Sequence, residues 1–257
     1  MPGSKVNTKV VLEYDGAGFS GFQLQARGRT IEGELRRALH ELSGEEVRIV
    51  GAGRTDAGAH ALGQVVNFRL PRRLSVSRLV SGLNARLPND IAALTADSVP
   101  EHFHARRDAR WRRYRYRYLD RPARPALERS RCWHMRTPMN VDRMAAAAKA
   151  LVGRHDWTSF CSAAEPAQAR VREMRTASVR RAGEFVELEL VAEGFLRGLA
   201  RGIAGALAEV GMDRRPVAWV GEVLASRDRS RAARTAPAGG LCLVEVIYET
   251  DMMKEAT

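Results

Sequence analysis

The spacing of hydrophobic and polar residues in the first part of the chain predicts alternating strands and helices. Apolar residues at every second position favour strands, and apolar residues at helical spacing behind the capping residue Thr30 favour a helix. The predicted elements are a strand over 8–14, a helix from Thr30 to about Leu42, strands over 47–50 and 64–69, a helix over 75–85 and a strand over 91–96. Their order is β-α-β-β-α-β.

The second part of the chain repeats that order with one extra helix. The predicted elements are a strand over 111–119, a helix capped by Asn140 and ending near residue 151, a hairpin over 175–181 and 184–191 turned at 181–183, helices over 195–211 and 216–225, and a strand over 241–248. We therefore expect an α+β fold of two ferredoxin-like halves with antiparallel or mixed sheets. The halves are predicted as domains 1–107 and 108–257, with a central cleft as the place for a ligand.

A glycine-rich segment, residues 51–64, joins two of the predicted strands and holds a single carboxylate, Asp56. Glycine leaves little bulk to keep a ligand away, and loops at strand ends often carry function. Arg54 lies two residues before Asp56, and His60 lies four residues after it. The segment is either a ligand-binding loop around Asp56 or a tight turn closed by an Arg54–Asp56 ion pair.

Two further segments place arginine beside aromatic residues or glycine. In the strand 111–118, one face carries Tyr114, Tyr116 and Tyr118 and the other carries arginine. The tyrosine face either packs in a core or offers one ring for stacking on a base, with arginines nearby for phosphates. In the helix 195–211, Arg201 lies opposite an apolar stripe among Gly198, Gly202 and Gly205, which favours close packing and an acidic partner.

Composition favours an anionic partner. The chain of 257 residues has a net charge of +12 and a pI of about 10.5, which is typical of nucleic-acid-binding proteins. Codon bias explains the preference for arginine, since only four basic residues are lysine, but not the excess of positive charge. The arginine-containing segments 120–131 and 227–240 are either solvated loops or phosphate-contacting arms. Three unpaired cysteines and the lack of an apolar signal or long apolar run predict a cytoplasmic protein without membrane contact.

The motif GRTDAGxHA at residues 53–61 resembles the signature of the tRNA pseudouridine synthase A family. Other family-like blocks follow in the same order: YDG at 14–16, GFQLQ at 21–25, FHAR at 103–106, RYRY at 113–116, WTSF at 157–160 and GLCLV at 240–244. The resemblance covers about residues 8–249. The chain departs from the family at Phe22, where tryptophan is more common, and at Leu199-Ala200 before Arg201, where the family usually has Met-Val.

The resemblance implies a homodimeric enzyme that isomerises uridines 38, 39 and 40 in the anticodon arm of tRNA. Asp56 would be the nucleophile, acting at C6 of the base or assisting glycosidic cleavage, and Arg54 would fill the space of the flipped base. Arg201 would hold Asp56 ionised, and Tyr114 would stack on the uracil. The expected substrate-binding residues are Tyr114, Arg54, His60, Leu241 and Leu243. The reaction needs no redox step, so neither a cofactor nor a metal is expected.

Two other functions stay open at this stage. A non-catalytic RNA-binding protein on the same scaffold would account for the charge and for the tyrosine–arginine strand, but not for the Asp56 loop. A metal-dependent hydrolase would use Asp56 and His60 with His102 and His104, because His-x-His is a reasonable ligand pair.

Overall fold

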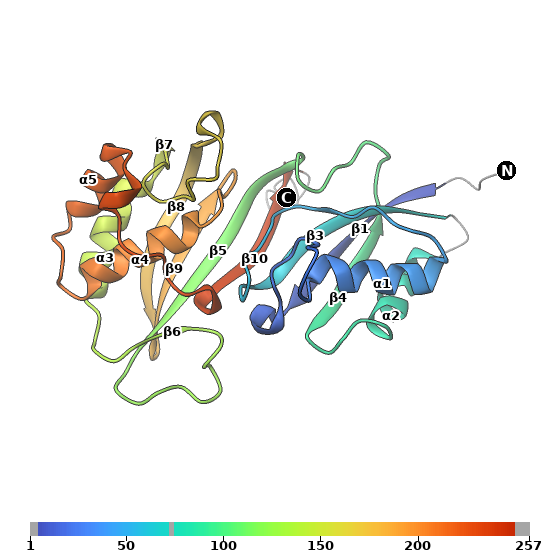
Figure 1. Cartoon of the computed structure of the whole chain (residues 1–257), viewed down its shortest axis with the longest axis horizontal. Coiled ribbons are helices and arrows are strands. Elements are labelled where there is room, and N and C mark those ends of the chain that lie inside the picture. The colour runs from blue at the N-terminus through green and yellow to red at the C-terminus, as the bar shows by residue number, and fades with distance from the viewer. Residues whose placement is uncertain (1–4, 72–74, 250–257) are drawn as a thin grey trace, which may run out of the picture. The chain divides into compact units, whose positions relative to one another are not determined.

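The computed structural model describes residues 5–71 and 75–249, which form two compact units (Figure 1). Unit 1 comprises the described residues up to Arg110 together with those from Leu243 onward. Unit 2 comprises Trp111–Cys242. The sequence-based division into 1–107 and 108–257 assigned the last strand to the second half, whereas its residues from Leu243 belong to unit 1.

Unit 1 has the predicted β-α-β-β-α-β order. Its elements are β1 (Lys5–Tyr14), α1 (Ile31–Ser43), β2 (Val50–Gly51), β3 (His60–Pro71), α2 (Leu79–Asn84), β4 (Ile91–Ser98) and most of β10 (Leu241–Tyr248). The strand order is β4-β1-β3-β10, and β2 pairs with β3. β1 runs antiparallel to both of its neighbours, which confirms the antiparallel character of this sheet.

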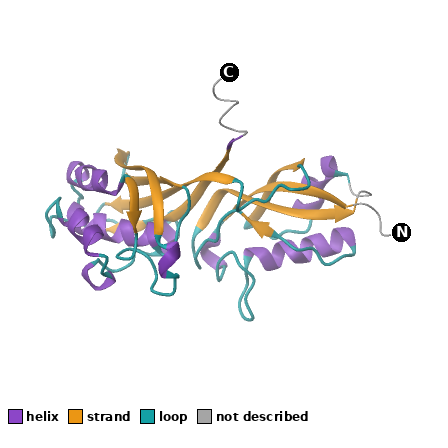
Figure 2. Ribbon diagram, turned by 90° about the horizontal axis from the view of Figure 1, so that it is seen from above, coloured by secondary structure: helices purple, strands orange, loops and turns teal. Residues whose placement is uncertain are grey.

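Alternation along β1 and β3 explains the core of unit 1. Val10 and Val66 are cross-strand partners and are fully buried, and so are Leu12 and, almost completely, Phe68 on the same sheet face. α1 begins where predicted, because the Thr30 hydroxyl accepts a hydrogen bond from the amide of Gly33 at 3.2 Å. Figure 2 shows the helices lying alongside the strands.

Two predicted elements of unit 1 are shorter in the structure. The strand expected over 47–50 is reduced to β2, so Val47 and Ile49 are buried without strand pairing. The helix expected over 75–85 is a 3₁₀ turn, Val76–Arg78, followed by α2. In both places apolar side chains are buried at a spacing that suggests a regular element. A loop or a 3₁₀ turn can bury the same side chains, so the spacing alone does not distinguish them.

Unit 2 contains most of one strand, β5 (Ala109–Asp120), together with β6 (Trp133–Met135), α3 (Val141–Ala148), β7 (Gly153–Asp156), β8 (Val171–Ala182), β9 (Phe185–Ala192), α4 (Leu199–Gly211) and α5 (Trp219–Ser226). The strand order is β5-β9-β8-β7, and β6 pairs with β5. The β5–β9, β8–β9 and β7–β8 pairs are antiparallel, whereas β6 is parallel to β5. The α+β prediction with antiparallel and mixed sheets is therefore confirmed. β6 and β7 were not predicted.

Two turns in unit 2 differ from the sequence prediction. The β8–β9 hairpin turns at Gly183 and Glu184, one residue later than expected, because Gly183 supplies a backbone φ of 59°. α4 begins at Leu199 and not at residue 195, because Gly198 precedes it with a φ of 78°.

Among the described residues, no helix is long and apolar enough to cross a membrane.

A candidate active-site loop in unit 1

The glycine-rich segment forms a loop that runs from β2 to β3 and is fastened to the segment after β1. The amide of Phe22 donates to the carbonyl of Thr55 at 3.1 Å, and the amide of Gly58 donates to the carbonyl of Phe19 at 3.2 Å. Within the loop, Ala59 donates to the carbonyl of Asp56 at 3.1 Å. The backbone on both sides of Asp56 is therefore held by hydrogen bonds, which gives the carboxylate a defined position.

Two glycines allow this close approach. A Cβ on Gly16 would lie 1.9 Å from the carbonyl oxygen of Ala59, and a Cβ on Gly21 would lie 2.9 Å from that of Thr55. Gly21 also has a φ of 106°, which other residues rarely adopt. The family-like blocks at 14–16 and 21–25 thus have a physical role, because they form the support of the Asp56 loop.

A buried polar network lies beneath the loop. The hydroxyls of Tyr14 and Thr55 are 2.8 Å apart. The Gln64 side-chain amide donates to the Tyr14 hydroxyl at 3.3 Å and to the carbonyl of Gly53 at 2.7 Å. The Tyr14 hydroxyl accepts from Gln64, and either hydroxyl can donate in its hydrogen bond with Thr55. All three side chains are at most 6% exposed, so the network is shielded from water.

The sequence alone predicts no role for Tyr14, Thr55 or Gln64. Thr55 lies within the motif at 53–61, Gln64 ends the glycine-rich segment 51–64, and Tyr14 lies in the family-like block at 14–16. A signal was present for Gln64, because it is a polar residue at a position of β3 that is fully buried. A buried amide needs hydrogen-bond partners, and the adjacent loop supplies them.

His60 begins β3 and connects the loop to the turn after β1. Its Nδ1 lies 3.1 Å from the amide nitrogen of Gly16 and 3.1 Å from a carboxylate oxygen of Asp15. The Gly16 amide can only donate, so in the neutral ring Nδ1 accepts that bond and the proton is on Nε2. His60 is 7% exposed. The observed contacts give it a role in holding the loop, and its predicted role in substrate binding is untested.

Arg54 and Asp56 flank Thr55 and differ from it in exposure. Thr55 is buried, Asp56 is partly exposed and Arg54 is exposed. Within the described part of the chain, the Arg54 guanidinium makes neither a hydrogen bond nor an ion pair. The alternative of a turn closed by an Arg54–Asp56 ion pair is therefore wrong for this structure, and the Arg54 guanidinium is available for a ligand.

The tyrosine face of β5 divides into one candidate ligand residue and two core residues. The Tyr116 hydroxyl donates to the carbonyl of Pro237 at 2.9 Å, and the Tyr118 hydroxyl donates to the carbonyl of Ala204 at 2.8 Å. Burial raises the pKa of both phenols well above the usual value, so both hydroxyls stay protonated. Tyr114 is 5% exposed, and its ring lies edge-on to Phe195 with 4.6 Å between centroids.

The arginine face of β5 is largely neutralised by glutamates of β9. Arg113 lies 3.3 Å from Glu189, and Arg115 lies 3.9 Å from Glu187. Arg117 reaches Glu128 at 2.9 Å and Glu187 at 4.0 Å. Paired arginines supply less net charge to a phosphate, so the expectation that these arginines serve RNA has no support in the geometry.

Arg201 lies in a crowded part of unit 2, as its glycine neighbours predicted. Its Nε donates to the carbonyl of Ala236 at 2.8 Å, and the Ala236 amide donates back to the carbonyl of Arg201 at 3.1 Å. A Cβ on Gly205 would lie 2.1 Å from the carbonyl oxygen of Arg234. Glycine therefore lets the 227–240 segment approach α4. Gly198 is outside the helix, contrary to the prediction.

The two leucines predicted to bind substrate, Leu241 and Leu243, belong to one strand but to different units. Leu241, in unit 2, is 6% exposed, and Leu243, in unit 1, is fully buried. Asp56, Arg54 and His60 belong to unit 1, whereas Tyr114 and Arg201 belong to unit 2. The predicted site residues are therefore divided between the two units.

The ligand set of the hydrolase alternative is not assembled in this structure. Within residues 5–71 and 75–249, no group of three or more His, Cys, Asp or Glu side chains is placed to hold a metal ion. Nδ1 of His104 accepts hydrogen bonds from the amides of Arg106 and Arg107 at 3.3 and 3.2 Å, as the cap of a turn.

Comparison with known proteins shows similarity along most of the chain. A family profile described as tRNA pseudouridine synthase matches residues 10–108 and 147–249. A tRNA pseudouridine synthase A from Myxococcus xanthus is 44% identical over 241 residues, which cover 93% of this chain and 91% of that protein. Proteins of the same name from Moorella thermoacetica and Brevibacillus brevis are 43% and 41% identical to this chain. Each alignment covers 93% of this chain and 98% of the related protein.

Proposed function

Because the chain belongs to the tRNA pseudouridine synthase A family, we propose that it isomerises uridine to pseudouridine at positions 38, 39 and 40 of the tRNA anticodon arm. One observation in the structure supports a catalytic role for Asp56. It is the partly exposed carboxylate of a loop whose backbone is hydrogen-bonded on both sides of it and packed against Gly16 and Gly21, and the preceding Thr55 is buried. Such support of a reactive group by its surroundings is what preorganised catalysis requires.

The reaction is an isomerisation, so atoms and electrons balance without a co-substrate. The bond between N1 of uracil and C1′ of ribose breaks, and a bond between C5 and C1′ forms. The hydrogen on C5 leaves as a proton, and N1 ends with a proton. A carboxylate can serve this sequence by adding to C6 of the base or by stabilising the electron-poor C1′. Asp56 is the residue proposed for either role.

The other proposed roles follow from the exposure of each side chain. Arg54 is exposed and its guanidinium makes no hydrogen bond or ion pair within the described residues, so it can enter the space that a flipped base leaves. Tyr114 offers a ring for stacking on the uracil, with Leu241 or Leu243 as apolar wall. Arg201 is half-buried with its Nε hydrogen-bonded to the carbonyl of Ala236, and its guanidinium is the proposed partner that holds Asp56 ionised. His60 holds the loop through Gly16 and is the remaining residue proposed to bind substrate.

The proposal includes a homodimer that acts in the cytoplasm on tRNA, with no metal or organic cofactor. The basic excess of the chain, +12, suits a polyanionic substrate. The alternative, a non-catalytic RNA-binding protein, would not explain why the loop that carries Asp56 is held in place by hydrogen bonds. Measurement of turnover separates these two functions.

Replacement of Asp56 tests the proposed function. Tritium at C5 of uridine is released to water when pseudouridine forms, so labelled tRNA reports turnover directly. We expect Asp56→Asn to abolish release while its melting temperature and tRNA affinity stay close to those of the wild type. Asp97→Asn, which removes an exposed carboxylate of β4, is the control and should remain active. Release by Asp56→Asn at more than a few per cent of the wild-type rate would exclude Asp56 as nucleophile.

A further inference from the structure

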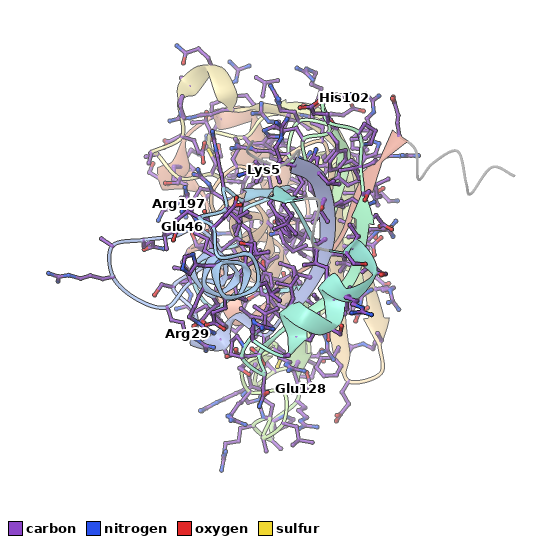
Figure 3. The ribbon with its side chains drawn as sticks, turned by 90° about the vertical axis from the view of Figure 1, so that its right-hand side faces the viewer. Lys5, Arg29, Glu46, His102, Glu128 and Arg197 are labelled. Atoms are coloured by element: carbon purple, nitrogen blue, oxygen red, sulfur yellow. The ribbon has the colours of Figure 1, made fainter. Side chains whose placement is uncertain are left out.

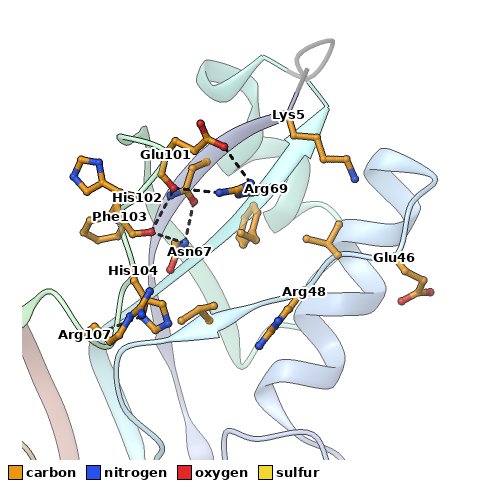
Figure 4. A pocket seen from close by; sticks show the side chains of 14 residues that line it. Lys5, Glu46, Arg48, Asn67, Arg69, Glu101, His102, Phe103, His104 and Arg107 are labelled. Carbon is orange, nitrogen blue, oxygen red and sulfur yellow. Dashed lines mark hydrogen bonds and ion pairs between the residues drawn. The ribbon is translucent and has the colours of Figure 1, made fainter. Parts of the chain in front are cut away.

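Unit 1 has a basic pocket that the proposed active-site loop does not use. The pocket has a volume of about 700 Å³ and lies among β1, β2, β3 and the loop after β4 (Figure 4). Four of its lining residues are permanently cationic, and two are glutamates. The cationic residues are Lys5, Arg48, Arg69 and Arg107. Pockets for small organic ligands are mostly apolar, so this lining favours an anionic ligand.

Two of the four cations are not neutralised by the protein. Lys5 lies 2.8 Å from Glu45, and Arg69 lies 3.3 Å from Glu101. Arg48 and Arg107 are both exposed, and neither side chain makes an ion pair or hydrogen bond within residues 5–71 and 75–249. Their guanidiniums present the planar donor geometry that phosphate oxygens accept.

The pocket has a rigid base. Asn67 donates from its side chain to Asn7 at 2.9 Å and accepts from the amide of Ala105 at 2.9 Å. Asn7 in turn donates to the carbonyl of Phe103 at 2.9 Å. Both asparagines are at most 7% exposed. These bonds fix the loop after β4, and with it the turn that carries Arg107, onto the sheet.

His102 and His104 add polar groups to the same rim. Because Nδ1 of His104 accepts two backbone amides, the proton of its neutral ring is on Nε2, where it can serve a ligand. Lys5, Glu46 and His102 are labelled in Figure 3, which views the chain from the right-hand side of Figure 1. A carboxylate oxygen of Glu46 lies 3.5 Å from Nδ1 of His40, which is outside the pocket lining.

The pocket is separated from Asp56 along the sheet. His60 opens β3 next to the Asp56 loop, and Asn67 lies at the pocket. A rise of about 3.3 Å per residue puts Asn67 about 23 Å from His60 along the strand. A single nucleotide cannot span that distance, whereas a strand of several nucleotides can.

We propose that this pocket binds the phosphodiester backbone of the tRNA substrate, with Arg48 and Arg107 as phosphate ligands, at a point remote from the target uridine. The proposal rests on tRNA as the substrate of the proposed function. Contacts to phosphate give affinity and orientation but no sequence information, so one remote anchor can serve several tRNAs and target positions. Neither arginine is proposed to contact the reacting base.

Binding of unmodified tRNA, measured over a range of salt concentrations, tests the proposal. We expect Arg48→Ala and Arg107→Ala each to weaken binding about three- to tenfold at moderate salt. Each should reduce the log–log salt slope by about one, because each removes one phosphate contact. Arg78→Ala is the matched control, since Arg78 is an exposed arginine of unit 1 outside the pocket.

Lysine variants keep the test valid if an alanine variant folds poorly. Arg48→Lys and Arg107→Lys retain the charge, so they should keep the salt slope of the wild type. Wild-type affinity and slope for the folded Arg48→Ala, Arg107→Ala double variant would overturn the proposal. Binding of unmodified tRNA does not depend on turnover, so this result is independent of whether Asp56→Asn confirms the proposed reaction.

Discussion

The hydroxyl of Tyr14 lies 2.8 Å from the hydroxyl of Thr55, the residue that directly precedes Asp56. Tyr14 ends β1 and Thr55 lies in the loop between β2 and β3, so this bond joins two segments that are 41 residues apart in sequence. Gln64 extends the connection to Gly53. The position of the candidate nucleophile therefore depends on a buried network, and not only on the glycine-rich backbone.

Loss of this network should lower kcat more than it changes KM. Thr55→Val keeps the shape of the side chain but removes the hydroxyl, which leaves Tyr14 without that partner, at a cost of about 0.5–1.5 kcal/mol in stability. We expect a several-fold lower kcat, because Asp56 is then less well fixed. Steady-state tritium release from tRNA measures both constants, and thermal melting measures the stability.

Thr55→Ser separates positioning from simple destabilisation. Serine keeps the hydroxyl and loses a methyl group, so it should restore most of kcat even if the melting temperature stays low. A valine variant as active as the serine variant would show that the hydroxyl does not position Asp56.

Arg54→Ala should reduce turnover strongly while it changes tRNA affinity little. The side chain is exposed and makes no hydrogen bond or ion pair within the described residues, so its removal should cost little stability. Its proposed task is to occupy the space of a flipped base, and flipping a paired base costs about a few kcal/mol more than flipping an unpaired one. The loss should therefore be largest for target uridines in the stem. Rates measured separately at paired and unpaired positions check this, and equal losses at both would remove the wedge role.

The sequence was sufficient for the element order of unit 1 and for the motif because both depend on local patterns. Thr30 and Asn140 begin helices where predicted, since capping depends on a side chain and the next few amides. The glycines of α4 correctly predicted that another segment packs closely against the helix. A Cβ on Gly202 or on Gly205 would clash with the backbone carbonyl of Phe160 or of Arg234. The identity of those neighbours depends on tertiary packing and has no local signal.

The sequence was insufficient where partners come from distant segments. The pairing of the β5 arginines with Glu187 and Glu189 depends on the register with β9, which the alternating pattern does not define. The Tyr14–Thr55–Gln64 network also unites three segments. The cations around the basic pocket are spread from Lys5 to Arg107 and form no cluster in the sequence.

Tyr114 should affect turnover, whereas Tyr118 should affect stability. Stacking of a base on an aromatic ring is worth about 1–3 kcal/mol, so Tyr114→Leu should lose most of its activity. Tyr114→Phe should stay active if the ring only stacks, and should stall late in the reaction if the hydroxyl helps to remove the C5 proton.

Tyr118→Phe is the control, because it removes a buried hydroxyl that bonds to Ala204. It should lower the melting temperature and leave turnover unchanged. Turnover and melting are measured for all three variants. A fully active but less stable Tyr114→Leu variant would place Tyr114 in the core together with Tyr118.

The ion pair between Asp120 and Arg181 should make unit 2 sensitive to acid. Both carboxylate oxygens of Asp120 accept from the Arg181 guanidinium at 2.8 Å, and Oδ2 also accepts from the amide of Met139 at 2.9 Å. Burial alone would raise the pKa of Asp120, but these hydrogen bonds and the charge of Arg181 outweigh it and lower the pKa.

A lowered folded-state pKa means that the ionised carboxylate stabilises the fold. This stabilisation is fully present above the unfolded-state pKa of about 4 and is lost as the pH falls through the lower folded-state pKa. Asp120→Asn should therefore reduce the free energy of unfolding at pH 7 by about 1.5–3 kcal/mol. The difference between the wild type and Asp120→Asn should shrink at acidic pH, because protonated Asp120 also lacks the charge. Melting temperatures at a series of pH values from 7 down to 3 measure this, with Asp97→Asn as control for an exposed carboxylate. A difference that stays constant over this range would show that the charge of Asp120 does not stabilise the unit.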